Sequence, residues 1–189
     1  IKGSFGRWMA IFAIIALGVG FFCGLKVCKS AFLETGNTYL QEHKFFDYEL
    51  ISTLGLEAED VESVSALPEV AYAEGSFSAD VLISEEDSDA GEIVSKFLTI
   101  SDNINTPSLK AGRLPENDGE CLADPQYFNE SDIGKTISIS SSNEEDTLDI
   151  LANDAYTIVG IADSPLYLNF ERGSSSVGDG SVACFIMIP

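Results

Sequence analysis

An apolar run near the start of the chain restricts the folds that the chain can adopt. Residues 8–25 (WMAIFAIIALGVGFFCGL) are 18 positions without a charge, and Lys2, Arg7, Lys26 and Lys29 flank them. At about 1.5 Å per helical residue the run reaches roughly 27 Å, close to the hydrocarbon thickness of a bilayer. Backbone polar groups inside a bilayer must bond to one another, which favours a helix. The sequence therefore predicts a transmembrane helix over residues 8–25.

A cleavable signal peptide is the main alternative to a retained span. Such a peptide has an apolar core of 7–15 residues that ends at a small-x-small cleavage site. The present run is longer, and the residues after it (26–29, KVCK) make a poor site. A lipoprotein signal also fails, because Phe22 and Val27 precede Cys23 and Cys28 where a small residue is needed. These features favour a span that stays in the protein.

Small residues recur every four positions inside the run, at Ala16, Gly20 and Gly24. This spacing places them on one helix face, where a second helix can approach closely. Glycine and alanine are also common in membrane spans without any such contact. Both readings stay open, and the first predicts helix packing through these three residues.

Charge divides the chain sharply. Residues 1–30 contain four basic residues and no acidic one, whereas the remaining 159 residues hold six basic and 31 acidic residues, a net charge of −25. So acidic a domain will not bind nucleic acid or anionic lipid through bulk electrostatics. The short basic segment 1–7 favours a cytoplasmic N-terminus, with residues 45–189 outside. Helical spacing of apolar residues in 30–42 predicts that the span continues as a stalk helix over 26–44.

The first part of the outer domain has a strand, helix, strand order. Residues 46–54 alternate between apolar and polar side chains, as a half-buried strand requires. Residues 57–67 begin with carboxylates that suit a helix N-terminus, carry an apolar stripe and stop at Pro68. Residues 70–84 resume strand character, with a break at Gly75.

The rest of the domain is rich in short strands bounded by turn residues, as in a small sheet or barrel-like module. The predicted strands are 93–100, 121–123, 136–140, 148–151, 155–161 and 182–188. A long connection runs through Pro107, Gly112 and Pro115, and 143–146 and 173–180 are predicted loops. The predicted core consists of the apolar members of these periods: Leu50, Leu54, Val61, Val64, Leu67, Val81, Ile83, Ile137, Ile139, Ile158, Val159 and Ile161.

Cysteines and carboxylates offer two weak candidate sites. Cys121 and Cys184 can either pair in an oxidising compartment or remain as two half-buried free thiols. The acidic turn at 85–92 (EEDSDAGE) lacks the ligand order of a calcium-binding EF-hand loop, which predicts a solvated hairpin tip.

No catalytic, cofactor-binding or metal-binding residue is predicted, and the chain is not expected to be an enzyme. The lone histidine, His43, lies among polar residues, far along the chain from any supported nucleophile. The tripeptide Gly134-Lys135-Thr136 matches the end of a phosphate-binding loop, but Asn129 stands where that loop needs glycine. This segment is predicted to be a turn that leads into a strand.

The order of several segments resembles the start of a bacterial ABC transporter permease of the MacB/FtsX-like family. The segments are Gly6-Arg7-Trp8 with 10–26 behind it, 45–56 (FFDYELISTLGL) followed by EDVESV, 110–124 (KAGRLPENDGECLAD), 156–175 (YTIVGIADSPLYLNFERGSS) and 185–189 (FIMIP). Together they extend over nearly the whole chain. Each motif is short and mostly structural, and the specificity lies in their order.

The resemblance implies an α+β fold: an N-terminal transmembrane helix and then a MacB-like periplasmic core domain. That domain would have a ferredoxin-like β-α-β "porter" part and a smaller β-rich part, with the first half of the porter part at 46–84 and the rest at roughly 93–161. Family members carry at least three further spans downstream, so this chain is expected to be a fragment in the bacterial cell membrane. Its implied partners are a cytoplasmic ABC ATPase subunit, bound through regions outside the chain, a second permease copy and the lipid bilayer.

Two functions of different classes follow. In the first, the outer domain couples ATP hydrolysis by a separate subunit to export or mechanical signalling across the membrane. In the second, the chain is a single-span, membrane-tethered binding or adhesion module. Three more apolar runs of about 20 residues downstream would favour the permease, and an early stop would favour the tethered module.

Overall fold

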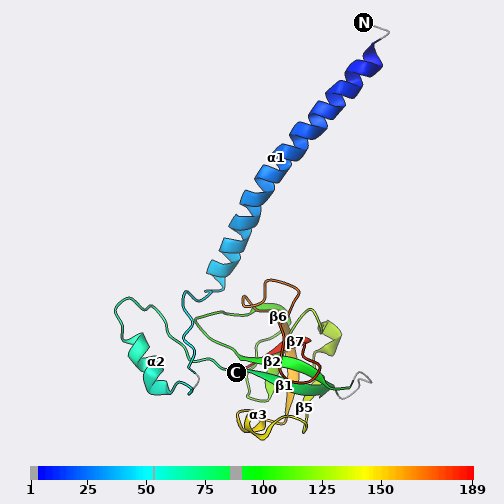
Figure 1. Ribbon diagram of the computed structural model, residues 1–189. Coiled ribbons are helices and arrows are strands. Elements are labelled where there is room, and N and C mark those ends of the chain that lie inside the picture. The colour runs from blue at the N-terminus through cyan, green and yellow to red at the C-terminus, as the bar shows by residue number, and fades with distance from the viewer. Residues whose placement is uncertain (1–3, 53, 86–90) are drawn as a thin grey trace. The chain divides into compact units, whose positions relative to one another are not determined.

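A computed structural model describes residues 4–52, 54–85 and 91–189, in two compact units, residues 1–42 and 43–189. In the first unit, α1 (Phe5–Glu42) is one continuous helix of 38 residues with no buried side chain (Figure 1). It takes in residues 8–25 and most of the predicted stalk, and ends at Glu42 rather than at residue 44. Residues 1–3 of the predicted cytoplasmic segment 1–7 lie outside the described residues. In length and composition α1 alone among the described helices is suited to cross a membrane.

The second unit is built around a closed six-stranded barrel. Its strands are β1 (Ser78–Glu85), β2 (Ile93–Thr99), β4 (Glu120–Ala123), β5 (Thr136–Ile139), β6 (Ala155–Asp163) and β7 (Cys184–Ile188). Hydrogen bonding follows the order β1-β2-β7-β4-β6-β5, and β5 then pairs with β1. The β2–β7 and β4–β6 pairs are parallel, and the other barrel pairs are antiparallel. Closure satisfies backbone groups that an open sheet would leave at its edges.

Strand β6 is long enough to close the barrel and also hold a seventh strand. One edge pairs with β4, while the opposite edge pairs first with β5 and then with β3 (Ser108–Gly112). Close backbone approach at this junction needs glycine. A Cβ on Gly112, whose φ is +79°, would lie 2.3 Å from the Val159 carbonyl oxygen, and one on Gly160 would lie 2.5 Å from the Arg113 carbonyl oxygen.

The barrel interior supplies the main core. Strand β7 is buried along its whole length, since Cys184, Ile186 and Ile188 join the interior cluster while Phe185 and Met187 join a second cluster. Six predicted core residues are confirmed as buried: Val81, Ile83, Ile137, Ile158, Val159 and Ile161. Ile139 is partly buried against the interior cluster.

The prediction for residues 46–77 is wrong in its main features. Residues 46–52 and 54 form no strand, and the side chains of Leu50 and Leu54 are 65% and 97% exposed. A helix does form, α2 (Ala58–Ser65), but it has no buried residue, Val61 and Val64 are half-buried, and Leu67 is exposed. The alternating pattern was present, but no strand in the described residues pairs with this segment. Thr53 lies outside the described residues.

Other boundaries are corrected in the barrel region. The strand expected over 70–84 begins only at Ser78, and the one expected at 148–151 is replaced by α3 (Glu145–Asp149), a short helix that also takes up part of the predicted loop 143–146. β3 lies in the connection that was expected to have no strand. The remaining strands are confirmed within a few residues. The chain is thus a mixed helix and sheet protein, and its sheet closes as a barrel; the ferredoxin-like arrangement is not confirmed.

Candidate functional site

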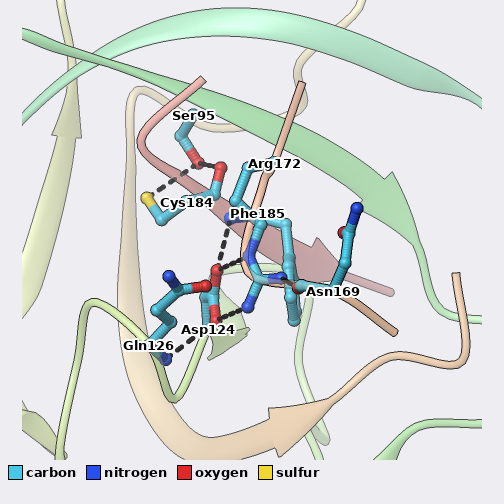
Figure 2. A network of polar contacts seen from close by, with 7 residues as sticks. All are labelled: Ser95, Asp124, Gln126, Asn169, Arg172, Cys184 and Phe185. Carbon is cyan, nitrogen blue, oxygen red and sulfur yellow. Dashed lines mark hydrogen bonds and ion pairs between the residues drawn. The ribbon is translucent and has the colours of Figure 1, made fainter. Parts of the chain in front are cut away.

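The most heavily buried charges in the described residues form one ion pair, Asp124 with Arg172 (Figure 2). Asp124 follows β4 directly, and Arg172 lies in the connection between β6 and β7. The Arg172 Nε atom is 2.5 Å from Asp124 Oδ2, and Nη2 is 2.7 Å from Oδ1. The side chains are 8% and 0% exposed. This two-pronged geometry is the strongest form of carboxylate recognition by arginine.

Backbone groups complete the surroundings of this pair. The Asp124 carboxylate also accepts N–H bonds from Gln126 at 2.9 Å and, more weakly, from Phe185 at 3.4 Å. Arg172 Nη1 donates to the Asn169 carbonyl at 2.7 Å, which ties the arginine to its own loop. Because burying an unpaired charge is costly, these bonds explain how the pair is tolerated inside the fold. They leave the carboxylate engaged with the fold rather than free to bind a substrate.

Two aromatic rings lie next to the guanidinium. The rings of Tyr167 and Phe185 stack with centroids 5.0 Å apart and planes 6° apart. Arg172 Cζ lies 5.3 Å from the Tyr167 centroid and 5.1 Å from that of Phe185, within cation–π range. Burial raises the pKa of the Tyr167 phenol. The Tyr167 ring packs on Phe185 and on the second cluster, so it covers the outer face of β7. This contact explains why the strand is buried on both faces.

The segment 164–172, which we call the clip, is fixed at both ends. Ser164 and Pro165 are buried at its start, and Arg172 is held by Asp124 at its end. Between these anchors, Leu168 and Phe170 are 65% and 86% exposed. The clip therefore presents apolar side chains from a loop whose ends cannot move freely.

The sulfur and hydroxyl groups of the barrel interior do not form a reactive centre. Ser95 Oγ donates to the Cys184 carbonyl at 3.4 Å, and Cys184 Sγ lies 3.5 Å from Ser95 Oγ. Burial raises the pKa of Cys121 to about 12, which keeps it a thiol at neutral pH. Among the described residues no group of three or more His, Cys, Asp or Glu side chains is placed to hold a metal ion.

The open question about the cysteines is answered by strand register. None of the four cysteines forms a disulfide, and Cys121 and Cys184 are fully buried rather than half-buried. Leu122 opposes Met187 and Ala123 opposes Ile186 in an antiparallel pair, so Cys121 stands level with Ile188, four residues along β7 from Cys184. At about 3.3 Å per strand residue this separates the two cysteines by roughly 13 Å along the sheet, too far for a disulfide.

The other segments noted in the sequence are placed as follows. Lys135 pairs with Asp132 at 2.7 Å, and Gly134, with φ +94°, turns the chain into β5, as predicted for this turn. The Nδ1 atom of His43 lies 2.8 Å from the Thr106 carbonyl oxygen. The acidic turn 85–92 falls mostly on residues 86–90, outside the described part of the chain. Ala16, Gly20 and Gly24 are exposed on α1.

Sequence reasoning missed both members of the central ion pair. They are 48 residues apart, so no local spacing connects them. One signal was available, because an acidic residue directly after a buried strand is costly unless a cation reaches it. The chain beyond residue 43 offers only six lysines and arginines as candidates.

The fold and these contacts define a class: a helix with the length and composition of a membrane span, joined in sequence to a barrel domain. No family model and no curated protein matches the chain. Among solved structures it is similar to the periplasmic region of MacB from Actinobacillus actinomycetemcomitans, with 16% identity and a TM-score of 0.41. The match covers 71% of this chain and 55% of that chain, so the present chain spans about half the length of that neighbour.

Proposed function

We propose that this chain is the anchor and extracytoplasmic domain of an ABC transporter permease subunit of the MacB/FtsX-like kind. The outer domain would couple ATP hydrolysis by a separate cytoplasmic subunit to export or to mechanical signalling. The observation that carries the proposal is α1, an apolar helix without buried residues that leads in sequence into a strongly acidic domain. The ordered motifs of the sequence resemblance supply the transporter class.

The topology is tested by cysteine labelling in intact cells. Ser174 is exposed in the β6–β7 connection, so a cysteine placed there in a background without native cysteines reports which side the domain faces. We expect a membrane-impermeant maleimide to label Ser174→Cys as well as a permeant one does. Labelling by the permeant reagent alone would place the domain in the cytoplasm and remove the basis of the proposal.

The transporter class is tested by the cytoplasmic partner. The ATPase is expected to bind regions of the protein outside this chain, so the test uses the full-length protein, purified through a tag from its native membranes. An ATPase subunit should co-purify with it. Absence of any co-purifying ATPase, from a protein whose Ser174→Cys variant labels from outside, would favour the alternative of a single-span tethered binding module.

Helix packing in the membrane is the finer part of the proposal. Gly20→Leu adds bulk to the face shared with Ala16 and Gly24, and should weaken a permease dimer by about 1–3 kcal/mol. Gly18→Leu is the matched control, because residue 18 lies about 200° around the helix from residue 20. Equal dimer fractions for both variants in a native gel would mean that the small-residue face contacts lipid.

A further inference from the structure

The segment 47–73 leaves the barrel and returns to it without packing a core of its own, and we call it the acidic lobe. It contains α2, which stands apart from the sheet in Figure 1. Its large apolar side chains are exposed to an unusual extent: Tyr48, Leu50, Ile51, Leu54, Leu56, Leu67 and Tyr72 are all more than half exposed. Concentrations of exposed apolar side chains mark interaction surfaces in soluble domains.

The entrance to the lobe is tied to the turn 101–106. Asn105 N–H donates to the Lys44 carbonyl at 3.0 Å, and Thr106 N–H donates to the His43 carbonyl at 3.0 Å. The Asn105 side-chain oxygen accepts the Phe46 N–H at 3.1 Å. The chain is therefore fixed to the barrel domain immediately before the lobe begins.

The exit from the lobe is tied to the same turn. The Glu74 carboxylate accepts the Asn103 N–H at 3.0 Å, the Asn103 side-chain amide at 2.8 Å and the Ile104 N–H at 3.2 Å. Inside the lobe, a capping box between Glu57 and Asp60 starts α2. A lobe with a closed base and a formed helix loses less conformational entropy on binding than a free segment would.

Charge decides what can cover this surface. The lobe has seven carboxylates, all exposed, and no lysine or arginine: Asp47, Glu49, Glu57, Glu59, Asp60, Glu62 and Glu69. A second copy that met the lobe face to face would place like charges together, and an anionic membrane would repel it. The complementary surface has apolar side chains at its centre and lysine or arginine at its rim.

We propose that the acidic lobe is a docking element for a partner protein whose apolar contact surface is rimmed by basic residues. The exposed leucines and tyrosines fill the centre of the contact, while the carboxylates orient the partner and raise the rate of association.

Binding of a defined probe tests the proposal on the whole chain in phosphatidylcholine nanodiscs, with the binding to empty nanodiscs subtracted because an amphipathic helix also binds lipid. The probe is an 18-residue amphipathic helical peptide of leucine and lysine. Two control peptides replace lysine by glutamate or leucine by serine. We expect the leucine/lysine peptide to bind, with affinity that falls as salt rises, and both control peptides to bind at least about tenfold more weakly.

Matched variants locate the contact. Leu50→Ser/Leu54→Ser should weaken peptide binding about tenfold, whereas Leu168→Ser, a leucine of similar exposure in the clip, should change it less than twofold. Glu59→Gln/Glu62→Gln in α2 should reduce binding more than Glu145→Gln/Asp146→Asn in α3, which removes the same charge elsewhere. All these positions are exposed, and an unchanged unfolding midpoint of the barrel verifies that each variant folds.

Three outcomes would overturn the proposal. Equal losses for lobe and control variants would mean that the peptide binds through bulk charge. A disulfide-linked dimer of Leu54→Cys, formed at the protein's working concentration, would assign the lobe to a second copy of the chain. A shift of an environment-sensitive dye on Leu54→Cys to an apolar environment, when phosphatidylcholine vesicles are added without peptide, would assign the exposed leucines to lipid.

Discussion

At the scale of single residues, most lysines and arginines of the second unit form an ion pair with a carboxylate. Five of the six lysines and arginines beyond residue 43 form ion pairs: Lys96, Lys110, Arg113, Lys135 and Arg172. Only the pair formed by Arg172 is almost fully buried. Its contribution therefore differs in kind from that of the exposed pairs, which water and salt screen.

Removal of one partner from the buried pair should be severe. Arg172→Leu leaves the Asp124 charge without a counter-ion and should lower the free energy of unfolding by about 3–5 kcal/mol. Arg113→Leu, which breaks a more exposed pair that water screens, should cost much less. Urea unfolding followed by circular dichroism measures both. Similar small losses for the two variants would mean that the clip does not depend on its ion pair.

The pair formed by Arg113 and Glu120 should respond to acid. Hydrogen bonds from Arg113 and from the Glu116 N–H lower the pKa of Glu120 from 4.5 to about 2. A depressed pKa in the folded state adds stability above pH 4.5 that is lost as the pH falls toward 2. The difference in Tm between the wild type and Glu120→Gln should therefore shrink between pH 5 and pH 2.

A cross-check uses the partner of Glu120. In an Arg113→Met background, the main cause of the lowered pKa is gone, so Glu120→Gln should then change the Tm less at pH 5. An unchanged effect of Glu120→Gln in that background would assign the acid response to other carboxylates.

At the scale of elements, two segments with apolar side chains differ in how far they are buried. Strand β7 is buried on both faces because the barrel lies on one side and the clip on the other. Helix α2 also carries an apolar stripe, yet none of its residues is buried and Val61 and Val64 stay half-buried. The difference lies in the neighbours, not in the elements themselves.

This contrast changes the effect expected of a charge placed in α2. Val64→Asp should cost less than about 1 kcal/mol of barrel stability, since the new carboxylate can reach water. Val81→Asp, at a fully buried barrel position, should prevent stable folding. Thermal unfolding of both variants gives the comparison. A large loss for Val64→Asp would mean that α2 packs on a core after all.

At the scale of the whole molecule, the barrel and the lobe should differ in stability against local opening. The barrel strands bond to neighbours on both sides, whereas backbone groups of 47–52 have no strand partner in the described residues. Amides of β2, β4 and β7 should therefore exchange with solvent at least about 100-fold more slowly than amides of 47–52. Hydrogen exchange measured by mass spectrometry on the whole chain tests this. Equal protection would show that the lobe is already covered by another surface.

Contacts between distant parts of the molecule could not be predicted from local sequence patterns. The long apolar helix and the strands β2, β6 and β7 follow from local apolar patterns, and those predictions place the elements within a few residues. Barrel closure, the added strand β3 and the Asp124–Arg172 pair depend on residues tens of positions apart. Sequence spacing carries no information about such pairings.

By itself, the sequence determined which segments are able to be buried, because that depends on side-chain chemistry and a local period. It also determined that one helix can span a bilayer, because that depends only on length and composition. Only the tertiary structure decided which apolar segments find a covering surface. Residues 46–54 and β7 both contain apolar side chains at strand spacing. Only β7 is buried, because it has a packed neighbour on each face.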